Sequence, residues 1–195
     1  MSANHTEPPS KGKRKKKNSH IRWIVTVFFV AVVISSTISF FSSTVLEGAG
    51  LVEAFLVLLL IVALGIVFDI IGVAVMSAEE KPFHAMAAKK VPGAAEALHL
   101  LRNAEKVSSI CNDVVGDICG IISGATGALI VTHITAGTDG ATKVLVSLLI
   151  TGLISAGTIG GKAAGKGIAV AASGKVLALC GRVLSVLPLK LDYKR

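Results

Sequence analysis

The stretch LVEAFLVLLLIVALGIVFDIIGVAVMS, residues 51–77, decides the fold of this chain. It is longer than the about 20 apolar residues that a helix needs to cross a bilayer. Asp69 is its only deep charge, since Glu53 lies near one end. An apolar run of this length predicts a transmembrane helix rather than an element of a soluble core.

Similar apolar stretches lie on both sides of this one, and predicted spans cover residues 23–43, 51–77, 107–131 and 143–161. The whole chain is 52% hydrophobic and only 5% aromatic, with 20 glycines. Its mean hydropathy of +0.74 lies well above that of an ordinary soluble domain. Small residues let helices approach closely in lipid. The sequence therefore predicts an all-α membrane protein with about four transmembrane helices and additional juxtamembrane helices.

The basic residues alternate between the two sides of these spans. Seven Lys and Arg precede the first span and none lies in the first loop. Five lie in residues 78–106, one (Lys143) at the edge of the next loop, and seven from Lys162 onward. Because basic residues are retained on the cytoplasmic side, this pattern predicts a multi-pass protein of the cell membrane with both termini cytoplasmic. It also accounts for the net charge of +8 without a nucleic-acid partner.

Four segments outside the spans have characters of their own. Residues 1–20 predict a disordered polybasic tail, and residues 190–195 a second cytoplasmic tail. Residues 79–103 predict juxtamembrane helices divided at Pro92-Gly93, and residues 168–187 an amphipathic helix along the interface. The basic run of the first tail is expected to bind anionic lipid headgroups, through Lys13, Arg14, Lys15, Lys16 and Lys17.

Three carboxylates, Asp69, Asp113 and Asp117, lie where the hydropathy predicts membrane. Such groups usually face a cavity or a partner and often serve ions. Asp113 and Asp117 are four residues apart and share a helix face, and the neighbouring Asn112 and Gly116 supply an amide oxygen and a backbone carbonyl. Oxygen ligands of this kind suit Mg²⁺ or Ca²⁺.

Two other interpretations of these carboxylates stay open. Asp113 and Asp117 lie near the cytoplasmic end of their span and could simply be hydrated at the interface. Asp69 could accept a hydrogen bond from a neighbouring helix in a structural role. The sequence alone does not decide between these interpretations and an ion site.

Small residues at four-residue spacing form two ridges. Gly116, Gly120 and Gly124 lie on the third span, and Gly152, Ala156 and Gly160 lie on the fourth. These ridges predict close packing of the third span on the fourth, or of two copies across a dimer axis.

The remaining reactive residues do not assemble a known catalytic pattern. The three cysteines form no C-x-x-C motif and do not have the spacing of zinc ligands. The sequence therefore predicts small buried residues at Cys111, Cys119 and Cys180 rather than a disulfide or a zinc site. The glycine-rich segment before Lys162 fails the spacing of a phosphate-binding loop. The sequence therefore predicts that the protein is not an enzyme.

The motifs resemble the transmembrane domain of the CNNM/CorB/CorC family of magnesium-linked membrane proteins. Phe68 to Ser77 is similar to the family's F-S-x-S-E-x-A-L-L-S-like element, and Ala94 to Lys106 to its basic helix. Ser108 to Val115 is similar to the S-T-I-L-x-x-N-N-L-V-N element, and Gly157 to Lys162 to G-E-x-x-P-K. The resemblance implies a homodimer with an acidic inward-open cavity and Mg²⁺ as its ion. The residues that would line this cavity are Asp69, Asn112, Asp113 and Asp117.

The chain departs from the family at defined positions. The family serines align with Asp69 and Ile71, the glutamate of the last motif with Thr158, and its proline with Gly161, so that Lys162 alone is matched there. The first span is additional, and these 195 residues include no paired CBS domains.

Three functional hypotheses follow. The first is transport or homeostasis of a divalent cation, Mg²⁺ above all, by a dimer. The alternative is a non-transporting membrane scaffold or partner subunit that retains the fold. A third is a lipid-surface or nucleic-acid binder acting through the basic run, which we expect mainly to set orientation.

Overall fold

The computed structural model describes residues 11–46, 48, 50–138 and 140–186, and this part of the chain is helical with no strand. In chain order the elements are α1 (Lys11–Leu46), α2 (Leu51–Ser77), α3 (Lys81–Ala88), α4 (Ala94–Arg102), α5 (Ala104–Ser109), the π-helix η1 (Ile110–Gly116), α6 (Asp117–Ile134), α7 (Ala141–Ala171) and α8 (Ser173–Val186). The predicted all-α fold is confirmed.

Four helical stretches of the described chain are long and apolar enough to cross a membrane: Ile21–Thr44, Leu51–Ser77, Ala104–Ile134 and Ala141–Ala171. The third of these runs without interruption through α5, η1 and α6. The predicted number of about four spans is confirmed, and the bounds predicted for the second span agree at both ends.

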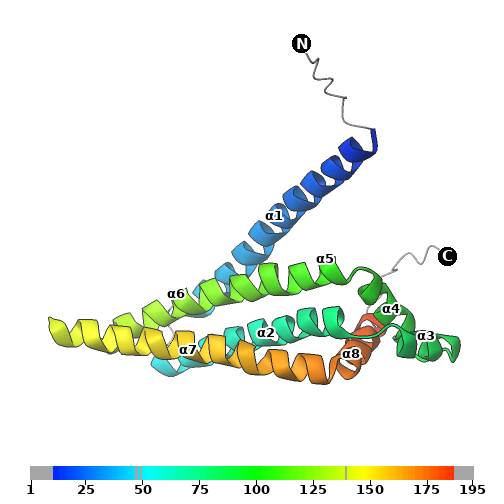
Figure 1. Ribbon diagram of the computed structural model, residues 1–195. Coiled ribbons are helices and arrows are strands. Elements are labelled where there is room, and N and C mark those ends of the chain that lie inside the picture. The colour runs from blue at the N-terminus through cyan, green and yellow to red at the C-terminus, as the bar shows by residue number, and fades with distance from the viewer. Residues whose placement is uncertain (1–10, 47, 49, 139, 187–195) are drawn as a thin grey trace, which may run out of the picture.

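α2 lies at the centre of the bundle, packed on α6 and η1 on one side and on α7 on the other. Figure 1 shows α2, α6 and α7 running side by side, whereas α1 leaves them at an angle. The buried residues of α2 recur every three or four positions, as one helical face requires. They are Ala54, Leu58, Ile61, Gly65, Asp69, Gly72, Ala74 and Val75.

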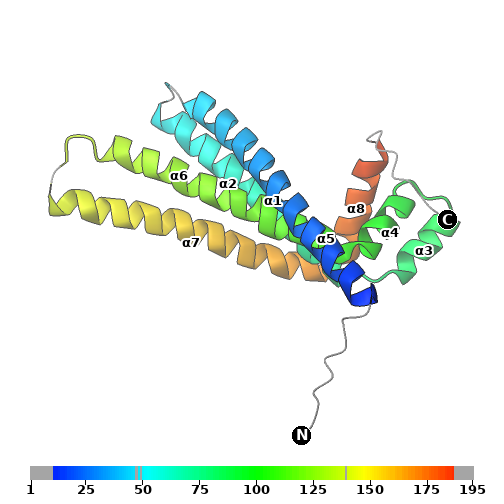
Figure 2. The ribbon, with the colours of Figure 1, turned by 90° about the horizontal axis from the view of Figure 1, so that it is seen from above.

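α1 is the least enclosed of the four long helices. No residue in the most apolar window of α1 is buried within the chain, as is also true of α7, but α7 packs along α2 and α6 whereas α1 touches its neighbours over a shorter stretch. α1 overlies α6 and α5 in the view of Figure 2, but its backbone lies against α6, η1 and α2, and α5 reaches it through Lys106, whose Nζ lies 5.5 Å from the centre of the Trp23 ring. α1 therefore exposes apolar side chains such as Phe28 and Phe41 to its surroundings, as a membrane permits.

A separate small core lies at the end of the bundle where α3, α4 and α8 meet. Pro82 lies in the first turn of α3, where the missing N–H is tolerated. Gly93 precedes α4 with a φ of 86°, so the predicted division at Pro92-Gly93 is confirmed. Its Cα lies directly against α8, because a Cβ at Gly93 would be 2.5 Å from the Arg182 backbone nitrogen.

Three predicted boundaries differ from the structure by more than three residues. α1 begins at Lys11, so residues 11–20 are helical instead of disordered, while residues 1–10 and 190–195 lie outside the described residues. α7 continues to Ala171, ten residues past the predicted end of the fourth span, and α8 therefore begins at Ser173 instead of residue 168. Lysine ends an apolar run but does not end a helix, and no proline interrupts the chain between Pro92 and Pro188.

Candidate functional site

The buried face of α2 carries one charged residue. Asp69 is 5% exposed and lies on the same face as Gly65 and Gly72, one turn from each. The α2 residues around it pack on η1, α6 and α7. A carboxylate at this position is surrounded by protein instead of lipid, as intramembrane ionisable groups generally are.

Gly72 makes room for Asn112 of η1. A Cβ at Gly72 would lie 2.7 Å from the Asn112 Cγ, so no larger residue fits there without moving the amide. Two turns earlier in α2, a Cβ at Gly65 would lie 2.9 Å from the Cys119 Cβ and 3.9 Å from the Gly116 carbonyl oxygen. The two glycines therefore bring the backbone of α2 against η1 on both sides of Asp69.

Two buried oxygens at this contact have no hydrogen-bond donor among the described residues. They are the Asp69 Oδ2 and the Asn112 Oδ1. The Asn112 amide is oriented by its nitrogen, because Nδ2 donates to the Ser108 Oγ at 3.3 Å. Buried polar atoms nearly always find a partner, so two unpaired acceptors on facing helices indicate a place for a positively charged ligand or a donor.

The helix that carries Asn112 is a π-helix over Ile110–Gly116. π-helical turns are rare and often occur at functional sites, because the wider turn changes which carbonyls are paired. Its last residue, Gly116, accepts a hydrogen bond from the Lys162 Nζ of α7 at 3.2 Å. We define the polar cluster as Asp69, Asn112, Gly116 and Lys162, because the turns of α2 on both sides of Asp69 lie against Gly116 and Asn112.

Asp113 and Asp117 do not join this polar cluster. Both side chains are exposed, whereas the intervening Val114, Val115 and Gly116 are buried. The shared face predicted for the two carboxylates is present, but it points away from α2. Among the described residues no group of three or more His, Cys, Asp or Glu side chains could hold a metal ion. Of the five predicted ligands, Asn112 and Gly116 therefore lie against the turns of α2 that flank Asp69, and Asp113 and Asp117 do not.

The two small-residue ridges do not pack against each other within the chain, contrary to the first of the two predicted arrangements. A Cβ at Gly120, Gly124, Gly152 or Gly160 would meet nothing within 4 Å, and Ala156 is exposed. The contact between α6 and α7 instead uses Gly127, where a Cβ would lie 2.8 Å from the Ile154 Cδ1. Spacing alone marks small residues, whereas the helix rotation decides which of them are covered.

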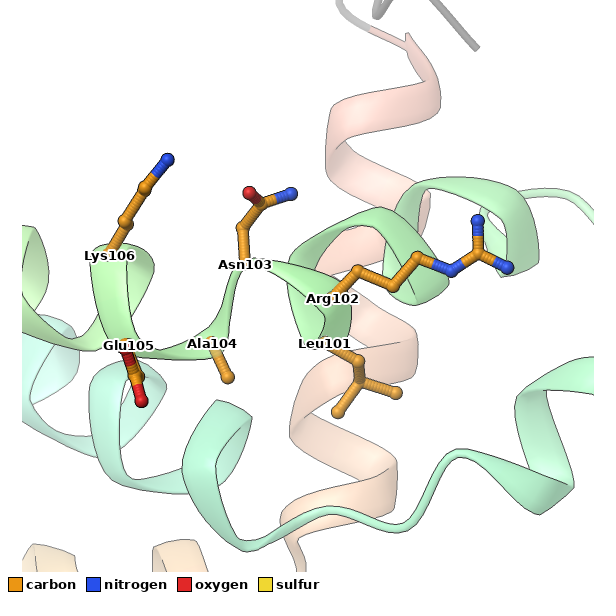
Figure 3. A pocket seen from close by; sticks show the side chains of 6 residues that line it. All are labelled: Leu101, Arg102, Asn103, Ala104, Glu105 and Lys106. Atoms are coloured by element: carbon orange, nitrogen blue, oxygen red, sulfur yellow. The ribbon is translucent and has the colours of Figure 1, made fainter. Parts of the chain in front are cut away.

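The predicted headgroup-binding residues, Lys13 to Lys17, lie in the first turns of α1, and their side chains lie outside the described part of the structure. A surface hollow of about 520 Å³ lies at the break between α4 and α5, lined by Leu101, Arg102, Asn103, Ala104, Glu105 and Lys106. Figure 3 shows that Arg102 and Lys106 point in different directions and do not converge on one ligand position. This hollow is therefore a weaker candidate than the polar cluster.

The cysteines agree with their predicted character. Cys111 and Cys119 are buried, Cys180 is half-buried, and all three are free thiols. Outside the membrane-spanning segments, burial raises the pKa of the Cys180 thiol, which disfavours its reactive thiolate form.

Sequence reasoning missed Lys162 and the two glycines of α2 as parts of the site. Lys162 was treated as the basic end of a span, and the family motif was the only signal that singled it out. Gly65 and Gly72 lie at a spacing of seven with Asp69 between them, and this pattern was visible in the sequence.

Comparisons with protein-family models, with curated proteins and with solved structures find no match to this chain. The likeness to the CNNM/CorB/CorC family therefore rests on the sequence motifs and stays a prediction.

Proposed function

We propose that this membrane protein binds a cation between Asp69 of α2 and Asn112 of η1 and serves cation transport or homeostasis. The single observation that carries the proposal is the pair of buried, unpaired oxygens on facing helices. A carboxylate oxygen and an amide oxygen that accept no hydrogen bond are suited to a cation, which needs oxygen ligands and brings positive charge.

Mg²⁺ is the first ion to test, because the family resemblance implies it and because the ligands are all oxygens. Mg²⁺ gives up its waters reluctantly and is commonly held by only one or two carboxylates, with waters completing the shell. One carboxylate, one amide oxygen and the Gly116 carbonyl are therefore enough to hold a partly hydrated ion. The positive-inside count supports placing this site towards the cytoplasmic side.

The first test is Mg²⁺-dependent thermal stabilisation of the detergent-purified protein. Asp69→Asn and Asn112→Ala should each lower the apparent Mg²⁺ affinity by about tenfold or more, since a ligand lost from a polar site in an apolar region costs on the order of 1–3 kcal/mol. Asp113→Asn and Asp117→Asn are matched controls on the exposed face and should change the affinity by less than about threefold. An equal response in all four variants would contradict the proposal.

A scaffold or partner-subunit role is the second candidate, favoured by the uncovered ridge of Gly152, Ala156 and Gly160 on α7. A ridge of small residues on a membrane helix suits contact with another helix, from a second copy or another subunit. Mg²⁺ uptake into liposomes that contain only this protein separates the two roles. Uptake that disappears in Asp69→Asn supports transport, whereas no uptake by the wild type supports the partner role.

A further inference from the structure

The ammonium group of Lys162 already occupies a position that a bound cation would use. Its Nζ lies 3.2 Å from the Gly116 carbonyl oxygen, although the two residues are 46 positions apart in the chain. This carbonyl is one of the three oxygens of the proposed cation site. An ammonium is itself a compact cation with three N–H donors, so it can stand in for an ion at such an oxygen.

Two glycines bring Lys162 to this position. A Cβ at Gly161 would lie 2.5 Å from the Ile66 Cδ1, and one at Gly165 would lie 2.9 Å from the Ile70 Cγ1. α7 therefore lies directly on the stretch of α2 that includes Asp69. Because the Gly116 carbonyl also lies 3.9 Å from the Cβ position of Gly65, the ammonium reaches the α2–η1 contact within about one helical turn of Asp69.

Lys162 lies on the helix that packs against the stretch of α2 containing Asp69, without an ion pair between the two side chains. The ion pair found among the described residues is His84–Glu80, at the surface, and the Asp69 Oδ2 has no donor. The buried carboxylate of Asp69 costs free energy in an apolar region, and a positive charge on a neighbouring helix reduces that cost. The half-buried ammonium on α7 can therefore offset part of the charge of Asp69 while leaving its Oδ2 free for a ligand.

We propose that Lys162 is a tethered competitor of the bound cation. This proposal rests on the proposed cation site. In the empty site the ammonium holds the Gly116 carbonyl and offsets the charge of Asp69. An entering cation takes over both oxygens, and the flexible side chain of Lys162 moves its charge away towards the nearby membrane boundary.

Competition of this kind limits how tightly the ion binds. A transport site must bind its ion strongly enough to admit it and weakly enough to release it. Because Coulomb repulsion grows with the charge of the ion, Lys162 lowers the affinity for Mg²⁺ more than that for Na⁺. Removing the ammonium should therefore increase Mg²⁺ affinity and increase the preference for Mg²⁺ over Na⁺.

The test measures Mg²⁺ and Na⁺ binding to the full-length purified protein by calorimetry and by thermal stabilisation. Lys162→Met should bind Mg²⁺ about tenfold more tightly, with a smaller gain for Na⁺. Lys166→Met is the matched control, because Lys166 lies one turn further along the same helix and is exposed, and it should change affinity by less than about twofold. Lys162→Gln keeps a donor for the Gly116 carbonyl without the charge, and it serves as the second variant if Lys162→Met does not fold.

A second measurement needs no ion. In a cycle of Asp69→Asn, Lys162→Met and the double variant, the ion-free double variant should unfold at a higher temperature than Lys162→Met alone. In Lys162→Met the Asp69 carboxylate loses the neighbouring positive charge, and the double variant removes that carboxylate as well. Strictly additive effects would overturn the charge compensation.

The outcomes separate this proposal from the proposed function. If Asp69→Asn abolishes Mg²⁺ binding but Lys162→Met does not strengthen it, the site stands and the competitor role fails. If Asp69→Asn and Asn112→Ala leave Mg²⁺ binding unchanged, the proposed function fails. If neither the wild type nor Lys162→Met binds a cation, the proposed function and the competitor role both fail.

Discussion

The inner face of α2 and the outer faces of α6 and α7 use glycine in opposite ways. A Cβ at Gly65 or Gly72 of α2 would lie less than 3.0 Å from Cys119 or Asn112. At Gly124 of α6 and Gly152 of α7 the same atom would meet nothing within 4 Å. The inner glycines thus set the distance between helices around the polar cluster, whereas the outer ones leave a smooth surface. A small-residue pattern on a membrane helix therefore indicates close packing only once the face opposite it is known.

Among substitutions of closely packed glycines, Gly93→Ala should lower the unfolding free energy most. Alanine at this position combines a left-handed backbone, with φ of 86°, and a Cβ 2.5 Å from the Arg182 backbone nitrogen, which cannot rotate away. We expect a loss of about 3 kcal/mol in unfolding free energy. Thermal unfolding followed by circular dichroism measures it. Gly174→Ala, on α8 with open surroundings, is the control, and an equal effect of both would contradict the assignment.

An intermediate effect is expected for Gly72→Ala. The new methyl group meets the Asn112 amide, which is the end of a side chain and can turn aside, so the cost in unfolding free energy is about 1–2 kcal/mol. The displaced amide should also weaken Mg²⁺-dependent stabilisation. Gly120→Ala, half-buried with open space at its Cβ, is the matched substitution on the facing helix. Unchanged Mg²⁺ stabilisation in Gly72→Ala would show that the position of Asn112 is irrelevant to the ion.

The smallest effect is expected for Gly152→Ala and Gly160→Ala. Alanine is the better helix former and meets no neighbour within 4 Å, so stability should rise by about 0.5–1 kcal/mol or stay level. Sedimentation in detergent reports the oligomeric state at the same time. A dimer that dissociates in these variants would place both glycines in a close contact between copies, as the second predicted arrangement of the ridges has it.

Much of the fold could be predicted because hydropathy reports burial in lipid directly. Residues 51–77 show this best, since their predicted span and the helix α2 have the same ends. α7 shows the difference between a span and a helix, because Lys162 ends the apolar run but the chain continues as helix to Ala171. A hydropathy profile locates the membrane boundary. The helix itself ends where a residue such as proline, or glycine in a left-handed conformation, stops it.

The polar cluster was predictable only in part. Asp69 and Asn112 could be selected, because an intramembrane carboxylate and an amide are unusual in such segments. The orientation of Asp113 and Asp117 could not, since a shared face follows from spacing but its direction follows from packing. The π-helix and the reach of Lys162 to Gly116 depend on hydrogen-bond register and helix contact, which residue types alone do not encode.

The length of the continuous helix α7 also indicates how deep the polar cluster lies in the membrane. Lys143 and Lys162 are nineteen residues apart on it, which is about 28 Å along the axis, close to the thickness of a hydrocarbon core. With Lys143 at one boundary, Lys162 lies at the other, and Asp69, about 27 Å from Leu51 along α2, lies at a similar level. The polar cluster is therefore far from the bilayer midplane. For the cation proposed above, the path from the side of α3, α4 and α8 is short, and nearly the whole barrier of the membrane lies beyond the polar cluster.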